Sequence, residues 1–205
     1  MGPCYQVIKT ENISTHANNQ LNYIKSVLSR SLIDHNKMRD TKTAAVLVIL
    51  TVIEKQLNIL FTHRTNNVGT HKDQVSFPGG LKESKDKSMI QIALRETKEE
   101  IGLLIDENVI LGILPEQNSI SGFQIYPFVC FIETLPQLKL NSEEVKNVFA
   151  IPLDWILNRK NWNYQVYKSP NGEERQVVMY QKYNNEIVWG ITGQILVSFA
   201  DLLYF

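Results

Sequence analysis

Three glutamates within one predicted helix are the residues of this sequence best suited to chemistry. Glu96, Glu99 and Glu100 fall within a sector of about 100° on a helix that turns about 100° per residue. Like charges at this spacing repel each other, and the helix macrodipole disfavours anions near the C-terminal end. A helix that accepts both costs is typical of a site that binds cations.

The residues around the glutamates favour a phosphate as the second ligand. Carboxylate oxygens suit Mg²⁺ or Mn²⁺, and Mg²⁺ often completes its coordination with water and substrate phosphate oxygens. Gly79 and Gly80 leave backbone amides and carbonyls unobstructed, and Arg95 can hold a carboxylate bidentately and fix its orientation. A solvated acidic helix face is the alternative, and the glycine pair, the arginine and Gly102 together argue against it.

Composition narrows the class of protein. Of the 205 residues, 43% are hydrophobic and 20% are charged, as is usual for a globular chain, and 21 basic residues balance 21 acidic ones. We therefore expect a small-molecule ligand, with no nucleic acid and no membrane as partner. The longest apolar run, 44–53, has about half the length of a membrane helix. Cys4 and Cys130 lie far apart outside any metal-binding spacing, which favours a cytoplasmic protein.

Hydrophobic periodicity predicts the elements that must position these residues. The glutamates belong to a helix over 86–101, which ends at Gly102. The other expected elements are helices over 17–34, from 153 and over 191–204, and strands over 43–53, 57–64, 110–114, 124–133, 145–152, 164–168 and 176–180. This order indicates one mixed α/β sandwich, with helices on both sides of β structure.

The glutamate helix and the glycines before it resemble the Nudix box, G-x5-E-x7-R-E-U-x-E-E-x-G-U, where U is apolar. The matching residues are Arg95, Glu96, Glu99, Glu100, Gly102 and Leu103. Thr97 stands at an apolar position, and Asp86 replaces the first glutamate. Arg95 follows Gly80 by 15 positions, against 14 in the general pattern. This one-residue expansion resembles the coenzyme A diphosphatase branch.

An upstream stretch supports the same branch. Residues 60–80 resemble its signature, which reads approximately LLTxRS-x3-R-x3-GQVxFPGG. Gly69 stands where the signature has arginine, and Asp73 stands where it has glycine, so a phosphate donor is lost and a repelling carboxylate is gained. The resemblance covers most of 43–203. It implies a Nudix-type α/β/α sandwich with a mixed sheet over 43–205, preceded by an N-terminal helical extension over 1–42.

The resemblance also implies the roles of the site residues. The implied ligands of Mg²⁺ or Mn²⁺ are Glu96, Glu100, Glu99 and a backbone carbonyl of Gly79 or Gly80. The implied catalytic residues are Arg95, which orients the glutamates, and a base that is Glu99 or a loop carboxylate, either Glu144 or Glu116. The candidates for substrate contacts are Arg64, His71, Lys72 and Gly79.

The leading hypothesis is an enzyme that hydrolyses coenzyme A or acyl-coenzyme A to phosphopantetheine and adenosine 3′,5′-bisphosphate. Gly69 and Asp73 favour a second reading, a Nudix hydrolase for ADP-ribose, dinucleotides or nucleoside triphosphates. A third is a non-catalytic nucleotide-binding module, but such a module has no need of three mutually repelling carboxylates. The N-terminal helix could cover an apolar sheet edge or mediate a homodimer, and its pattern does not choose between them.

Overall fold

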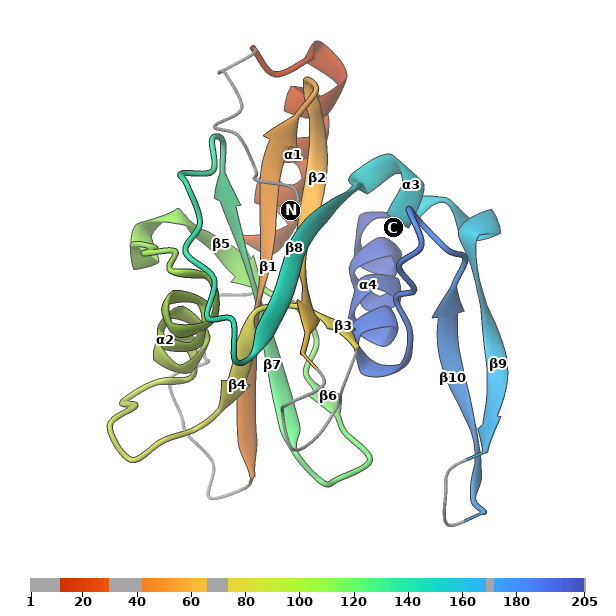
Figure 1. Ribbon diagram of the computed structural model, residues 1–205. Helices are drawn as coiled ribbons and strands as arrows, with labels where there is room; N and C mark the ends of the chain where they lie inside the picture. The colour runs from red at the N-terminus through yellow and green to blue at the C-terminus, as the bar shows by residue number, and fades with distance from the viewer. Residues whose placement is uncertain (1–11, 30–41, 66–73, 169–171, 205) are drawn as a thin grey trace.

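A computed structural model describes residues 12–29, 42–65, 74–168 and 172–204 (Figure 1). Within these residues, eight strands form one mixed sheet. Helix α2 (Met89–Ile101) packs on one face, and helices α1 (Thr15–Leu28) and α4 (Gly190–Leu203) pack on the other. The predicted α/β/α sandwich with a mixed sheet and an N-terminal helix is therefore confirmed.

Strand β1 (Thr43–Ile53) lies in the middle of the sheet. It runs antiparallel to β2 (Gln56–Arg64) and parallel to β7 (Gln124–Ile132). Glu54 and Lys55 form the turn between β1 and β2, both with left-handed backbone angles, φ 49° and 64°. The predicted strands over 43–53, 57–64 and 124–133 are therefore confirmed as β1, β2 and β7 to within one residue at each end.

The side chains of β1 alternate between two hydrophobic cores, because successive residues of a strand point to opposite faces. Leu47 and Ile49 join the core under α2, whereas Val48 and Leu50 join the core shared with α1 and α4. Both faces of the strand are buried, which explains why its sequence is a continuous apolar run.

The remaining strands extend the sheet or stand beside it. Strand β8 (Val145–Pro152) pairs with β2, while β5 (Ile110–Ile113) and β6 (Gln117–Asn118) pair with β7. Strand β3 (Val75–Ser76) adds to the end of β2. After the short helix α3 (Leu153–Leu157), a separate antiparallel ribbon leads into α4; its strands are β9 (Trp162–Lys168) and β10 (Glu174–Tyr180).

Helix α1 belongs to the hydrophobic core. Its residues Ala17, Leu21, Ile24 and Leu28 are buried in the cluster that also contains α4 and one face of the sheet. The helix ends at Leu28, and residues 30–34 of the predicted helix lie outside the described residues. Its apolar side therefore covers a face of the sheet, and a homodimer stays a prediction.

One smaller difference concerns the start of the site helix. Helix α2 begins at Met89, three residues later than predicted, because Ser88 caps it and Asp86 takes part in a preceding turn. No helix in the described parts of the chain is long and apolar enough to cross a membrane.

Strand β4 (Gly79–Leu81) carries the glycine pair against the middle of the sheet. It runs antiparallel to the start of β1, with Gly79 opposite Val46. A side chain at Gly79 would lie only 2.6 Å from the Cα atom of Val46, and its φ of 154° also favours glycine. Because α2 packs on both β1 and β4, the glycines and the glutamates lie side by side.

Candidate active site

Helix α2 presents its acidic residues to strand β4 while its apolar side is buried. The buried residues include Met89, Ile92, Ala93 and Ile101, and Gly102 ends the helix in a left-handed conformation with φ 70°. Thr97 is buried at the position where the Nudix box has an apolar residue. Its hydroxyl donates to the carbonyl of Ala93 at 2.7 Å, which satisfies the buried polar group.

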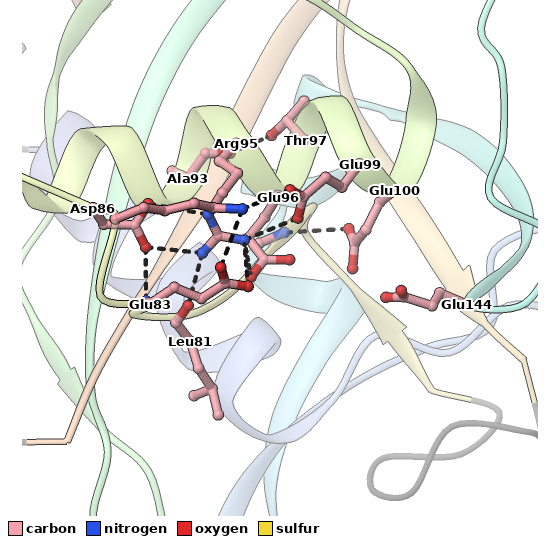
Figure 2. Close-up of polar contacts among 12 residues, drawn as sticks. Leu81, Glu83, Asp86, Ala93, Arg95, Glu96, Thr97, Glu99, Glu100 and Glu144 are labelled. Carbon is pink, nitrogen blue, oxygen red and sulfur yellow. Dashed lines mark hydrogen bonds and ion pairs between the residues drawn. The ribbon is translucent and has the colours of Figure 1, made fainter.

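Arg95 connects the loop before α2 to two of the helix glutamates (Figure 2). Its Nε and Nη2 atoms donate to the two carboxylate oxygens of Asp86, each at 3.0 Å. Its Nη1 atom donates to Glu96 and Glu99, each at 2.9 Å. Nη2 also donates to the carbonyl of Leu81 at 2.9 Å, so strand β4 is tied to the same side chain.

The bidentate partner of Arg95 is Asp86, not one of the helix glutamates. The Asp86 side chain is 3% exposed and also accepts from the Glu83 amide at 2.8 Å. Burial acts to raise the pKa of Asp86, but the bonds from Arg95 and Glu83 outweigh it and lower the pKa. Asp86 therefore stays ionised and anchors the guanidinium, while Glu96 and Glu99 each receive one hydrogen bond from Arg95.

The glycine pair is in direct contact with the glutamates. A side chain at Gly80 would collide with the carboxylate of Glu96, whose Oε2 would lie at 2.8 Å. The amide of Gly79 donates to Oε2 of Glu100 at 3.3 Å. Glycine at these positions therefore gives the carboxylates the room they occupy and brings the backbone next to them.

Glu100 is the most deeply buried acid of the cluster, since its side chain is 1% exposed. Arg64, at the end of β2, donates from Nη1 to Oε1 of Glu100 at 3.1 Å. Burial raises the pKa of Glu100 to about 8, opposed by Arg64 and the Gly79 amide and reinforced by Glu96 and Glu144. Burial also raises the pKa of Glu96. In both cases burial is the largest cause, and the charges of the neighbouring glutamates add to it.

Glu144 approaches the cluster from the loop before β8. Figure 2 shows its carboxylate pointing toward Glu100 from the side opposite Arg95. Its charge contributes to the raised pKa of both Glu96 and Glu100. The structure therefore brings this loop carboxylate to the helix glutamates, whereas Glu116 is exposed just before β6.

The candidates for substrate contacts divide into two groups. Arg64 and Gly79 lie at the cluster, where both bind Glu100. The Nε atom of Arg64 is buried without a hydrogen-bond partner among the described residues. His71 and Lys72 lie outside the described residues, as do the two positions where the sequence departs from the upstream signature.

The donor set fits a divalent cation. Hard carboxylate oxygens and the backbone of two glycines lie together, and a cation would compensate the charge of carboxylates whose pKa burial, with some help from neighbouring glutamates, raises. Among the described side chains, no three acidic, histidine or cysteine residues converge on one point. Glu96 and Glu99 instead form ion pairs with Arg95, and Glu100 forms an ion pair with Arg64.

Sequence reasoning missed two contributors to this geometry. Asp86 stands at the first acidic position of the box, so its place in the motif was visible in the sequence. Its bidentate pairing with Arg95 was not predicted. Asn141 donates from Nδ2 to Oε1 of Glu144 at 3.2 Å, and nothing in the polar stretch around it pointed to this contact.

Comparisons with known proteins report on the family and the fold. The model of the NUDIX domain matches residues 41–169. An uncharacterized Nudix hydrolase, NudL, from Pectobacterium atrosepticum is 34% identical over 161 residues, which cover 78% of this chain and 81% of that protein. NudL from Photorhabdus laumondii is 30% identical over 165 residues, covering 80% and 87%. A MutT/nudix family protein from Enterococcus faecalis shares the fold, with a TM-score of 0.56 and 16% identity over 92% of this chain and 73% of that chain.

Proposed function

The chain belongs to the Nudix hydrolase family, whose members hydrolyse diphosphate bonds, and on that premise we propose that its substrate is coenzyme A or acyl-coenzyme A. Water would split the diphosphate bond to give phosphopantetheine and adenosine 3′,5′-bisphosphate. The proposal includes Mg²⁺ or Mn²⁺ as the cofactor, as is typical of Nudix hydrolases.

One observation carries the choice of substrate. The stretch that resembles the coenzyme A diphosphatase signature runs from β2 to β4, and two of its residues meet at one buried glutamate. Arg64 binds Oε1 of Glu100, and the amide of Gly79 binds Oε2. The signature residues thus support the acidic cluster itself, which favours the branch that this signature marks.

The resemblance to the Nudix box, together with the contacts in the cluster, supports a task for each residue. Glu96, Glu99, Glu100 and the carbonyl of Gly80 would hold the divalent cation, which supplies charge neutralisation at the diphosphate and makes water more acidic. Arg95, anchored by Asp86, keeps Glu96 and Glu99 in place.

Glu144 is suited to accept the proton of the attacking water. It faces the cluster from another element and, in the described structure, is not bound by either arginine. A carboxylate base placed within hydrogen-bond reach of the attacking water contributes about 10²–10⁴-fold to a rate. Glu99, which Arg95 holds from the helix, is the alternative base.

A hydrolysis panel tests the proposed substrate. The purified protein would be incubated with Mg²⁺ and coenzyme A, ADP-ribose, NADH or a nucleoside triphosphate, and the products separated by chromatography. We expect phosphopantetheine and adenosine 3′,5′-bisphosphate from coenzyme A at the highest kcat/KM. A higher kcat/KM for ADP-ribose or a dinucleotide would replace coenzyme A with the second candidate, which Gly69 and Asp73 favour.

A further inference from the structure

The segment that leads into β8 is attached to the end of helix α2. The amide of Lys139 donates to the carbonyl of Ile101 at 3.0 Å, and the amide of Asn141 donates to the carbonyl of Glu100 at 2.9 Å. A side chain at Gly102 would lie 2.8 Å from Cβ of Lys139, so the two segments pack closely there. Asn141 is thus fixed to the backbone of a cluster residue.

The side chain of Asn141 uses its two ends differently. Its Oδ1 atom accepts from the amide of Glu143 at 3.2 Å, which forms a turn, and its Nδ2 atom donates to Oε1 of Glu144 at 3.2 Å. The carbonyl of Asn141 also accepts from the amide of Glu144 at 3.0 Å. An aspartate here could keep the turn but would place a second carboxylate against Glu144.

The other side of the same turn is attached to strand β2. The amide of Thr65, the residue after Arg64, donates to the carbonyl of Glu144 at 2.8 Å. The hydroxyl of Thr65 donates to the carbonyl of Glu143 at 2.6 Å. The backbone of Glu144 is therefore fixed between the end of α2 and the end of β2. The side-chain amide of Asn141 then orients the carboxylate of Glu144.

We propose that Asn141 is a positioning residue, whose side-chain amide holds the carboxylate of Glu144 in place beside Glu96 and Glu100. This inference rests on the proposed function, because it gives Glu144 its place in diphosphate hydrolysis. The side chain of Asn141 affects the cluster through Glu144, because its other hydrogen bond, from the amide of Glu143, lies within the turn.

Steady-state kinetics of Asn141→Asp test this role. The substitution preserves size and the turn, and it replaces the donor with a repelling carboxylate. We expect kcat to fall about tenfold or more while KM changes less than about twofold, as when an orienting partner of a site residue is lost. Asn158→Asp is the matched control, because Asn158 forms a similar turn with Lys160 and has no contact with the cluster. An unchanged kcat in Asn141→Asp would overturn the proposal.

A double-mutant cycle separates a positioning role from a general structural one. If Asn141 acts through Glu144, Asn141→Asp combined with Glu144→Ala should have the kcat of Glu144→Ala alone. Independent, multiplicative losses in the double variant would contradict a role through Glu144.

An NMR measurement without substrate tests the contact between Asn141 and Glu144 independently of the proposed function. The side-chain amide resonances of Asn141, assigned by their loss in Asn141→Asp, should shift when Glu144 becomes alanine and shift less when Glu143 becomes alanine. Equal shifts would refute the contact even in an active enzyme. A clear difference would support it even if the protein hydrolyses no coenzyme A.

Discussion

At the scale of single residues, charge compensation at the cluster is incomplete. Arg95 and Arg64 bind the carboxylates of Asp86, Glu96, Glu99 and Glu100, yet burial and mutual repulsion still raise the pKa of Glu96 and Glu100. Groups whose pKa is perturbed by burial and by specific charged neighbours are frequent at functional sites. Buried carboxylates with further carboxylates beside them are the physical reason to expect a cation here.

Glu100→Gln should separate function from folding. The glutamine keeps the size of the side chain and one of the two oxygens that accept from Arg64 and Gly79, but it loses the charge that attracts a cation. We expect kcat at saturating Mg²⁺ to fall at least about 100-fold, and the heat-unfolding midpoint to change little. Near wild-type turnover would exclude Glu100 as a ligand.

Asp86→Asn should lower stability as well as activity. The change removes the ionised partner of a buried guanidinium, and hydrogen bonds to charged groups are worth about 1.5–3 kcal/mol. Urea unfolding should show a loss of this size, whereas Asp106→Asn, in an exposed turn, should lose much less. Equal losses in the two variants would contradict the anchoring role of Asp86.

At the scale of elements, the site depends on how closely β4 and α2 approach each other. The Cβ atom that alanine adds at Gly80 would meet the carboxylate of Glu96. Glu96 would have to leave its position, although the backbone of Gly80 itself is not in a left-handed conformation. Glycine is therefore necessary at position 80 because β4 and α2 lie so close together. The backbone conformation of Gly80 does not itself require glycine.

Gly80→Ala should reduce activity while the protein stays folded. Misplacement of a site group by about 1 Å can cost up to about 100-fold, so we expect kcat to fall about 10- to 100-fold. Circular dichroism would report the fold, and Gly122→Ala would serve as control for backbone strain alone, because its Cβ meets nothing within 4 Å while its φ of 80° disfavours alanine. A kcat within twofold of wild type would show that Glu96 does not need this space.

Periodicity predicted the elements well, because burial on fixed faces leaves a regular pattern. The strands predicted over 43–53 and 57–64 correspond to β1 and β2, and the prediction of the acidic helix was wrong only at its start. Pairings between distant segments left no such pattern. The contact of Arg64 with Glu100 and the backbone contact of Asn141 with Glu100 depend on how β2 and the segment before β8 pack against α2, which single-chain periodicity does not specify.

At the scale of the whole molecule, the N-terminal helix and the site lie on opposite faces of the sheet. Helix α1 packs in the core shared with α4, while α2 and its glutamates lie on the other face. His16 and Gln20 of α1 also contact Asp154 of α3, at 3.2 and 2.6 Å. The helix therefore contributes to the sandwich rather than to the acidic cluster.

Stability of the metal-free protein should depend on pH through Glu100. Its pKa in the folded state is about 8, above the ordinary value of 4.5, so the folded state binds more protons between these values. Stability should therefore be greatest at the acidic end and fall as pH rises toward 8. Heat-unfolding midpoints measured in EDTA should show this decline in wild type and a smaller decline in Glu100→Gln. Equal declines would assign the effect to other groups.

The most direct test of the central claim is the position of bound metal. Crystals grown with Mn²⁺ would be measured at a wavelength where manganese scatters anomalously. We expect anomalous density bounded by Glu96, Glu100 and the backbone of Gly80, with a diphosphate analogue beside it. Well-ordered glutamates still paired with Arg95 and Arg64, with manganese and analogue bound elsewhere, would contradict it.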